Sequence, residues 1–307
     1  MKKVVSFCLW GDNPKYTIGA IRNAELAKEY YPEWECRFYM ANTVPQDIVV
    51  KLNSFDNVKL VMMKNDVGWD GMFWRFYPIT DSDVEVMISR DTDCRITDRE
   101  ARAVNEWLES GKTLHVMRDH PMHTEPIMGG MWGCRCKEMF DKIIETIYTP
   151  HPKLKKPEHL QEVVDAWLSV EKIKTQQGER KAIPESVYHN HGIDQKFTRA
   201  IMYNLSWNDA YINDAFPMYN AWSGRFDGER AINKEVNTGF SVPRKDWNDF
   251  VGQIYFEDDT PNEESAWYLE ARDKCIYMDT PDMETRDSSH YSIEEGQKAE
   301  YGSNYGE

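Results

Sequence analysis

The chain has 307 residues, of which 41% are hydrophobic, so it can bury a sizeable core, and general disorder is excluded. Its formal net charge of −15 is uneven, because residues 257–307 carry 15 acidic and 4 basic residues, a net of −11, and leave −4 for the rest. A mildly acidic body with an acidic tail lacks the basic surface of a nucleic-acid-binding protein, so we expect no nucleic-acid partner.

The apolar start of the chain predicts a buried strand rather than a signal peptide. The run 4–10 is short and ends in Gly-Asp-Asn-Pro. No run reaches the ~18 apolar residues that are needed to span a bilayer. Six scattered cysteines fit a reducing compartment, and the Cys-x-Cys at 134–136 lacks the second pair of a zinc site. We therefore predict a cytoplasmic protein without a transmembrane segment.

Strands and helices are predicted to alternate through the first half of the chain. Apolar runs predict strands at 3–10, 35–41, 57–64, 83–89 and 112–118. Helical spacing of apolar residues predicts helices at 17–31, 45–55, 71–80, 97–111 and 136–148. In the fourth of these, Thr97 is the expected cap, Glu100 completes a capping box and Gly111 ends the helix. The alternation predicts an α/β fold with a mainly parallel sheet flanked by helices.

The second half of the chain is predicted to carry an insertion and a tail. Residues 150–190 pass from a Pro- and Lys-rich stretch through an amphipathic helix to a polar stretch, which indicates a helical insertion or lid. A loop opening a helix follows at 191–204, and the last core strand is expected at 249–256. We therefore expect one domain over 1–256 and an acidic, partly disordered extension over 257–307.

Two carboxylates, Asp91 and Asp93, follow directly after the predicted strand 83–89. Ligands of open α/β sheets bind beyond the carboxyl ends of the strands, and alternate residues of an extended segment point the same way. Both carboxylates can then face one point, where two hard oxygen donors suit Mg²⁺ or Mn²⁺. The alternative is a solvated turn that caps the next helix, although Thr97 and Asp98 already supply that start.

Four motifs follow one another along the chain: "FWRFYPI…DVEVMISRDTDCRIT", "HVMRDHP", "IMGGMWG" and "HGIDQKF". With them, residues 4–256 resemble the GT-A nucleotide-sugar glycosyltransferases, particularly the retaining galactosyltransferase and glycogenin-like families. They also resemble uncharacterised glycosyltransferase-like proteins of bacteria and large viruses. The resemblance implies a GT-A, Rossmann-like domain that moves a sugar from a nucleotide-diphosphate donor to a saccharide or other hydroxyl acceptor. It implies Mn²⁺ or Mg²⁺ as cofactor, retention of anomeric configuration, and a part in polysaccharide biosynthesis.

The resemblance also implies roles for individual residues. Asp91 and Asp93 match the metal-binding D-x-D that holds the donor diphosphate, and Arg75 matches a basic residue that reaches the donor. Asp194 and Gln195 match an acidic-Gln pair beside the anomeric carbon. The other expected donor contacts are Leu9, Trp10 and Tyr16 in the first loop, Arg90 beside the diphosphate, Asp119 as a catalytic polar contact to the sugar, and Gly129, Gly130 and Trp132 in the loop beside it.

The chain departs from the pattern of these families at the third metal ligand. They often take it from a His in an H-x-x-G motif near the last strand, where this chain has Phe-Val-Gly-Gln at 250–253. His189, His191 or water are then the alternatives.

Each assignment has a structural alternative. Asp119 can belong to a salt-bridged polar loop, Asp194 can cap its helix, and Trp10 and Trp132 can be core residues. The basic run 153–159 can be a solvated surface or can contact an anionic acceptor or a membrane surface. For the whole chain, the alternatives are a non-catalytic carbohydrate-binding or structural protein on the same scaffold, and a phosphohydrolase.

Overall fold

The computed structural model describes residues 1–63, 68–120, 123, 125–148, 192–215, 237–246 and 248–263. The predicted insertion at 150–190, the tail after residue 263, and His189 and His191 lie outside these residues. No helix in the described ranges is long and apolar enough to cross a membrane.

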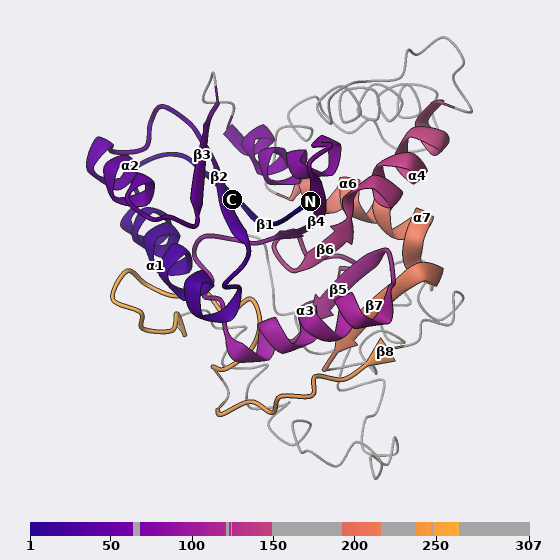
Figure 1. Ribbon diagram of the computed structural model, residues 1–307. Helices are drawn as coiled ribbons and strands as arrows, with labels where there is room; N and C mark the ends of the chain where they lie inside the picture. Colours follow the sequence, from indigo (N-terminus) through magenta and orange to yellow (C-terminus); the bar gives the residue numbers. More distant parts are fainter. Residues whose placement is uncertain are drawn as a thin grey trace, which may run out of the picture.

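An eight-stranded sheet forms the centre of the molecule, with the order β3-β2-β1-β4-β6-β5-β7-β8 (Figure 1). Its strands are β1 (Lys2–Leu9), β2 (Glu35–Met40), β3 (Val58–Met62), β4 (Val84–Ser89), β5 (Leu114–Arg118), β6 (Trp132–Arg135), β7 (Ala210–Asp214) and β8 (Asn237–Thr238). Strand β6 pairs antiparallel with β4 and β5, whereas the other strand pairs of this sheet are parallel. The predicted mainly parallel α/β sheet is confirmed.

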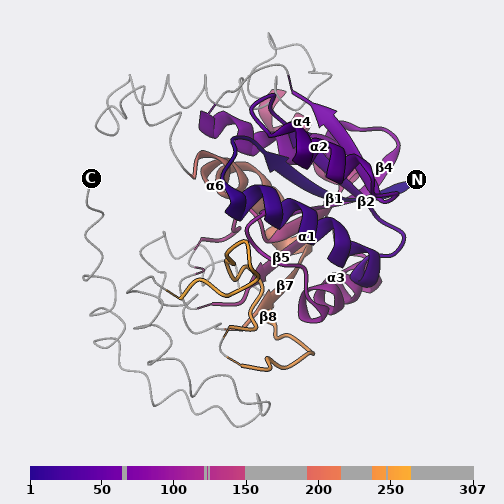
Figure 2. The ribbon, with the colours of Figure 1, turned by 90° about the vertical axis from the view of Figure 1, so that its left-hand side faces the viewer.

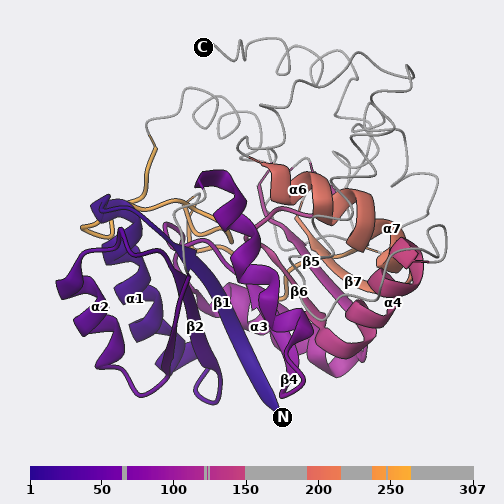
Figure 3. The same cartoon turned by 90° about the horizontal axis from the view of Figure 1, so that it is seen from above.

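Helices cover both faces of this sheet (Figure 3). One face packs on α1 (Pro14–Tyr30), α2 (Gln46–Asn53) and α3 (Asp98–Ser110). The other packs on η1 (Gly68–Thr80), α4 (Cys136–Tyr148), α6 (Ile193–Phe197), η3 (Thr198–Tyr203) and α7 (Asn204–Ser206), after which η4 (Trp207–Asp209) leads into β7. Alternate residues of β1 divide between the faces, because Val5 and Phe7 lie in the first core and Val4 in the second.

The helix ends follow the local sequence. The Asn13 side chain accepts a hydrogen bond from the Lys15 amide at 3.0 Å and so begins α1. Thr97 accepts one from the Glu100 amide at 3.3 Å, and Gly111, at φ +71°, ends α3. The predicted cap and stop are confirmed. The second half of the capping box is wrong, because the Glu100 carboxylate accepts from Arg90 and the Tyr31 hydroxyl instead.

Three short strands were missed and one predicted strand is wrong. β6 contains Gly133 and has only four residues, and β7 begins and ends in residues that are weak strand signals, so neither forms an apolar run. The predicted strand 249–256 instead contains Gly252 at φ +90°, which breaks the extended backbone, and among the described residues it makes isolated bridges from Ile254 to Cys94 and from Tyr255 to Pro261. Residues 257–263 continue from it as part of the folded body.

The chain order reverses between β1 and β4, which are neighbours in the sheet. From β1 the chain passes through α1 to β2 on one side, whereas β4 leads to the strands on the other (Figure 3). The Arg90 amide donates to Ser6 O at 3.0 Å, so β4 stays paired with β1 up to the carboxyl end of β4. A crevice for a ligand is expected at such a switch point, and Asp91 lies there.

Candidate functional site

Arg75 joins two of the predicted acidic residues. It projects from η1, is 1% exposed, and donates through Nη1 to Asp91 Oδ1 and through Nη2 to Asp194 Oδ2, the latter at 2.6 Å. Burial opposes the charge of Arg75, but Asp91 and Asp194 outweigh it and raise its pKa. Three segments that are distant in the sequence, namely η1, the loop after β4 and the first turn of α6, therefore meet at one charged guanidinium.

Gly129 and Gly130 let the backbone pass directly under these carboxylates. A Cβ atom on Gly129 would lie 2.5 Å from Asp194 Oδ2 and 2.7 Å from Arg75 Nη2, and one on Gly130 would lie 2.0 Å from Asp91 Oδ2. Gly129 O accepts hydrogen bonds from Ser89 Oγ at 2.8 Å and from Trp132 Nε1 at 3.0 Å, which hold the loop in place. Any larger residue would displace the acidic groups.

Asp93 lies beside a residue that the sequence analysis did not select, Lys15. Lys15 Nζ, from the first turn of α1, lies 2.9 Å from Asp93 Oδ2 and 4.8 Å from the centre of the Tyr16 ring. Asp93 is 8% exposed, and burial together with the neighbouring Asp91 raises its pKa although Lys15 acts in the opposite direction. Negative charge is therefore in excess around Asp93.

The charges of this site fit a divalent cation. Three carboxylates, Asp91, Asp93 and Asp194, face two bases, Arg75 and Lys15, which leaves a formal charge of −1. The bases bind one oxygen each of Asp91 and Asp93, so the second oxygen of each aspartate is the candidate metal ligand. A divalent cation would change the formal charge to +1 and make the site attractive to a diphosphate.

The protein supplies few ligands for such a cation. Among the residues that the structure describes, no group of three or more His, Cys, Asp or Glu residues could hold a metal ion. Mg²⁺, however, is usually bound through one or two carboxylates together with waters and substrate phosphates. Asp91 and Asp93 fit a cation of this kind, and they do not fit a closed metal site made entirely of protein ligands.

Asp194 uses one carboxylate oxygen, Oδ2, to bind Arg75, and its other oxygen is Oδ1. It is 0% exposed, and its Oδ1 has no hydrogen-bond partner in the described parts of the chain. The capping alternative for Asp194 is wrong, because Gly192 is the N-cap of α6. Gln195, the next residue, is half-buried. A buried carboxylate oxygen without a donor is costly, so Oδ1 is suited to accept from a ligand hydroxyl.

The first loop contributes differently from the prediction. Leu9 is 1% exposed and packs in the core, so its predicted contact with a donor is corrected to a packing role. Trp10 packs edge-on against Trp74 with their ring centres 6.2 Å apart. Tyr16 is 38% exposed, and with Lys15 it is the part of this loop that lies beside Asp93.

Arg90 and Trp132 also have packing roles. Arg90 points away from its neighbour Asp91 and donates to Glu100 at 2.7 Å and to two carbonyl groups, since adjacent residues of an extended chain face opposite sides. Trp132 is 0% exposed and packs on Phe76. Neither side chain reaches the acidic site, so both predicted donor contacts are corrected, although Trp132 still positions Gly129.

Asp119 lies in a separate cluster. Its two oxygens accept from Arg99 Nε and Nη2, each at 2.7 Å, from the Val251 amide at 2.8 Å and from Arg244 at 3.1 Å. Burial would raise the pKa of Asp119, but Arg244, Arg99 and the Val251 amide lower it overall. At 0% exposure, Asp119 holds α3 and two later segments together, as the salt-bridge alternative expected.

The comparisons with known proteins are of low similarity. No known family matches the chain, and no curated protein matches it. Among solved structures, Staphylococcus aureus TarS residues 1–349 has 13% identity and a TM-score of 0.33 over 55% of this chain and 56% of that chain, so this chain spans about half of it. Mannosyl-3-phosphoglycerate synthase from Rubrobacter xylanophilus has 11% identity and a TM-score of 0.36 over 61% and 80%. Mannosyltransferase PcManGT from Pyrobaculum calidifontis has 10% identity and a TM-score of 0.34 over 46% of each chain. TM-scores this low carry no argument about function, which therefore has to be argued from the fold and the site of this chain.

Proposed function

We propose that this protein is a glycosyltransferase that moves a sugar from a nucleotide-diphosphate donor to a hydroxyl of a glycan acceptor. One observation supports it most strongly: Arg75 pairs with both Asp91 and Asp194 above the Gly129-Gly130 backbone, at the switch point of the sheet. Three of the four sequence motifs that resemble GT-A glycosyltransferases supply the residues of this arrangement, and these residues come together from four separate segments.

The donor diphosphate is expected beside Asp91 and Asp93. A bound Mn²⁺ or Mg²⁺ would supply a Lewis acid that neutralises the leaving diphosphate. Of the chain's own residues, Asp91 and Asp93 would hold that ion, and Arg75 would keep the Asp91 carboxylate in place. Lys15, in the first turn of α1, adds a positive charge near the same point, and the amino end of a helix also favours a phosphate.

The donor sugar is expected over Gly129 and Gly130. There the free oxygen of Asp194 can accept from a sugar hydroxyl, and its negative charge can stabilise positive charge that develops at the anomeric carbon. Asp194 and Gln195 are then the candidate catalytic residues of a retaining transfer. Gln195→Ala should lower turnover far more than donor affinity, because a group that acts on developing charge contributes mainly in the transition state.

The test is donor binding with and without Mn²⁺. We expect UDP, GDP or dTDP sugars to raise the melting temperature only with metal present, and a ligand at 100 times its Kd stabilises by about 2.7 kcal/mol. Asp91→Asn and Asp93→Asn should remove this shift. Asp56→Asn, which breaks an exposed pair with Lys28, is the matched control and should retain it.

The outcomes separate the functional classes. Donor hydrolysis or transfer supports the enzyme, whereas sugar binding without turnover supports the alternative of a non-catalytic carbohydrate-binding protein. Unchanged donor affinity in both aspartate variants would overturn the assigned metal site. We keep polysaccharide biosynthesis, peripheral membrane contact and a cytoplasmic location as predictions.

A further inference from the structure

The loop that carries Asp91 and Asp93, residues 91–96, is held through its backbone groups by several polar contacts. From α1, Asn23 Nδ2 donates to Thr92 O at 3.2 Å and to Cys94 O at 2.8 Å, while its Oδ1 accepts from the Ile96 amide at 3.1 Å. Asn23 is 1% exposed. One buried amide side chain thus binds three points of the loop.

Helix α1 approaches this loop unusually closely. A Cβ atom on Gly19 would lie 2.1 Å from Thr92 O, so only glycine allows the helix to reach this position. Gly19 lies one turn before Asn23 and accepts from its side chain at 3.0 Å. Helix and loop therefore form one packed unit.

A second segment, residues 254–260, also holds the loop; we call it the clamp segment. The Tyr255 amide donates to Asp93 O at 2.8 Å, and Ile254 forms a bridge with Cys94. Arg95 Nη2 donates to Phe256 O at 3.0 Å. Figure 2 shows this part of the chain running beside α1. The carbonyls of Thr92 and Cys94 thus accept from Asn23 of α1, and the carbonyl of Asp93 accepts from the clamp segment.

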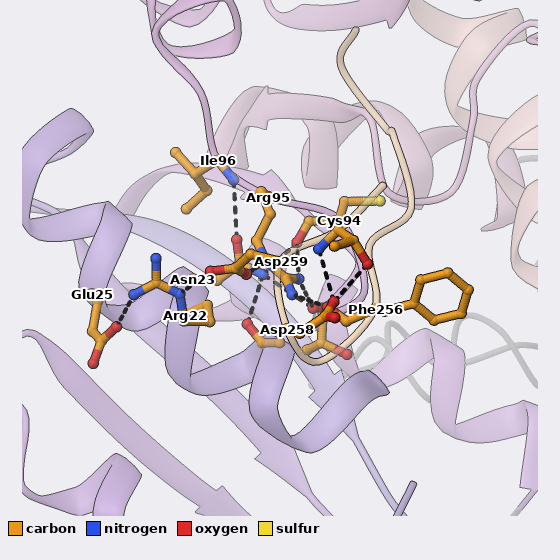
Figure 4. A network of polar contacts seen from close by, with 12 residues as sticks. Arg22, Asn23, Glu25, Cys94, Arg95, Ile96, Phe256, Asp258 and Asp259 are labelled. Carbon is orange, nitrogen blue, oxygen red and sulfur yellow. Dashed lines mark hydrogen bonds and ion pairs between the residues drawn. The ribbon is translucent and has the colours of Figure 1, made fainter. Parts of the chain in front are cut away.

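Asp259 closes this arrangement (Figure 4). Its Oδ1 accepts from Arg95 Nε at 2.8 Å and its Oδ2 from Arg22 Nε at 2.7 Å, so it joins the loop to α1. Asp259 has φ +63°, and the turn around it is closed by the Phe256 amide, which donates to Thr260 O at 2.9 Å. Few residues other than Gly, Asn and Asp adopt this backbone conformation readily.

We propose that the clamp segment positions the metal-binding aspartates, with Asp259 as its central positioning residue. Its expected effect on metal binding rests on the proposed function. The backbone carbonyl of Asp93 accepts from the clamp segment, while its carboxylate contacts Lys15. Small divalent cations such as Mg²⁺ demand near-ideal geometry at about 2.0–2.1 Å, so a loop with freedom to shift would bind them less tightly.

The contacts of Asp259 with Arg22 and Arg95 join parts of the chain that are far apart in the sequence. Arg22 and Arg95 lie in the first third of the chain, whereas Asp259 follows the last described part of the sheet by about twenty residues. The binding geometry of the first half therefore depends on a turn that folds back from far along the chain. Shortening the chain before residue 254 would remove the contact altogether.

The test uses the full chain with Asp259→Asn, which suits the same backbone conformation but removes the charge. Asp258→Asn is the matched control, because among the described residues Asp258 bonds within the turn alone, to Thr260 at 2.6 Å and 3.0 Å. Three quantities are measured: hydrogen exchange of residues 91–96 without ligand, the Kd of Mn²⁺ without nucleotide, and the melting temperature. Arg95→Lys is a second variant that keeps a positive charge, should Asp259→Asn not fold.

We expect Asp259→Asn to speed exchange in 91–96 and to weaken Mn²⁺ about 10–100-fold, the range for residues that orient metal ligands, while Asp258→Asn changes neither. Unchanged exchange, or faster exchange with an unchanged Kd of Mn²⁺, would overturn the proposal. If the wild-type protein binds no Mn²⁺ either alone or with UDP present, the proposed function fails, and hydrogen exchange alone then decides whether the clamp segment holds the loop.

Discussion

Strands β4 and β5 both lead into an Arg-Asp dipeptide, but the two aspartates have different surroundings. Strand β4 is followed by Arg90-Asp91, and β5 ends at Arg118, which is followed by Asp119. In both cases the arginine turns away and pairs with an acid inside the fold, Arg90 with Glu100 and Arg118 with Asp214, each at 2.7 Å. In both cases the aspartate binds an arginine from another element.

The difference lies in the balance of charge around each aspartate. Asp119 accepts from Arg99, Arg244 and a backbone amide, so bases are in excess and its side chain is 0% exposed. Asp91 must share Arg75 with Asp194, and its side chain is 38% exposed. A strand-end carboxylate is therefore a structural contact where bases outnumber acids, and a candidate binding group where acids outnumber bases.

The largest expected effect compares the same substitution at these two positions. Asp119→Asn should lower the free energy of unfolding by about 3–5 kcal/mol, because two arginines lose the buried carboxylate that they share. Asp91→Asn should change it by less than about 1 kcal/mol, since Arg75 keeps its bond to Asp194. Urea unfolding of both variants measures this. Equal losses would mean that Asp91 is also a structural contact.

The second prediction concerns the backbone under the acidic site. Gly130→Ala should weaken Mn²⁺-dependent donor binding about 100-fold, because the new methyl group displaces Asp91 Oδ2. Gly111→Ala is the control: Gly111 has φ +71° and open space around it, so alanine costs stability, about 1 kcal/mol, without affecting binding. Titration calorimetry and thermal unfolding on both variants distinguish the two effects. Normal donor binding in Gly130→Ala would place the donor elsewhere.

The sequence predicted the sheet well and placed Asp91 and Asp93 directly after a strand, because both depend on local pattern; the role of this pair as metal ligands stays a prediction. Apolar runs identified β1 to β5, and the position after β4 identified Asp91 and Asp93. The short strands β6 and β7 could not be found in this way, because they are stabilised by pairing with distant strands rather than by an apolar run of their own. The strand prediction for residues 249–256 was wrong for the opposite reason: these residues form an apolar run, but they pack around a turn.

The partners of charged residues could not be predicted either. Nothing near Asp119 in the sequence indicates that Arg99 and Arg244 surround it, and nothing near Asp93 indicates Lys15. These contacts depend on how α1, α3 and the segment after β8 pack. The only available signal for Lys15 was its place in the first turn of a helix that follows β1, at the same edge of the sheet as Asp93.

Lys15 allows a sharper test of the acidic site. Lys15→Met should tighten Mn²⁺ binding about tenfold in the absence of nucleotide, because Asp93 loses a competing positive charge held at 2.9 Å. It should also weaken binding of a nucleoside diphosphate, since a positive charge is lost near the phosphates. Lys28→Met, which removes an exposed pair with Asp56, is the control and should change neither. Weaker Mn²⁺ binding in Lys15→Met would show that Lys15 organises Asp93 rather than competing for it.

The smallest expected effect is a pH dependence of stability that comes from His115 on β5, the strand that leads to the buried Asp119. His115 on β5 is 0% exposed, stacks on Trp107 and bonds to Asn213 on β7 at 2.8 Å. Burial lowers the pKa of His115 to about 3, so it stays neutral in the folded protein while the unfolded chain takes up a proton near pH 6.5. The unfolded state therefore binds more protons, and stability falls as the pH falls below 6.5. For this one group the loss between pH 7 and pH 6 is about 0.7 kcal/mol. His115→Gln should reduce the difference in unfolding free energy between these two pH values by that amount, and an unchanged difference would mean that His115 is not the source.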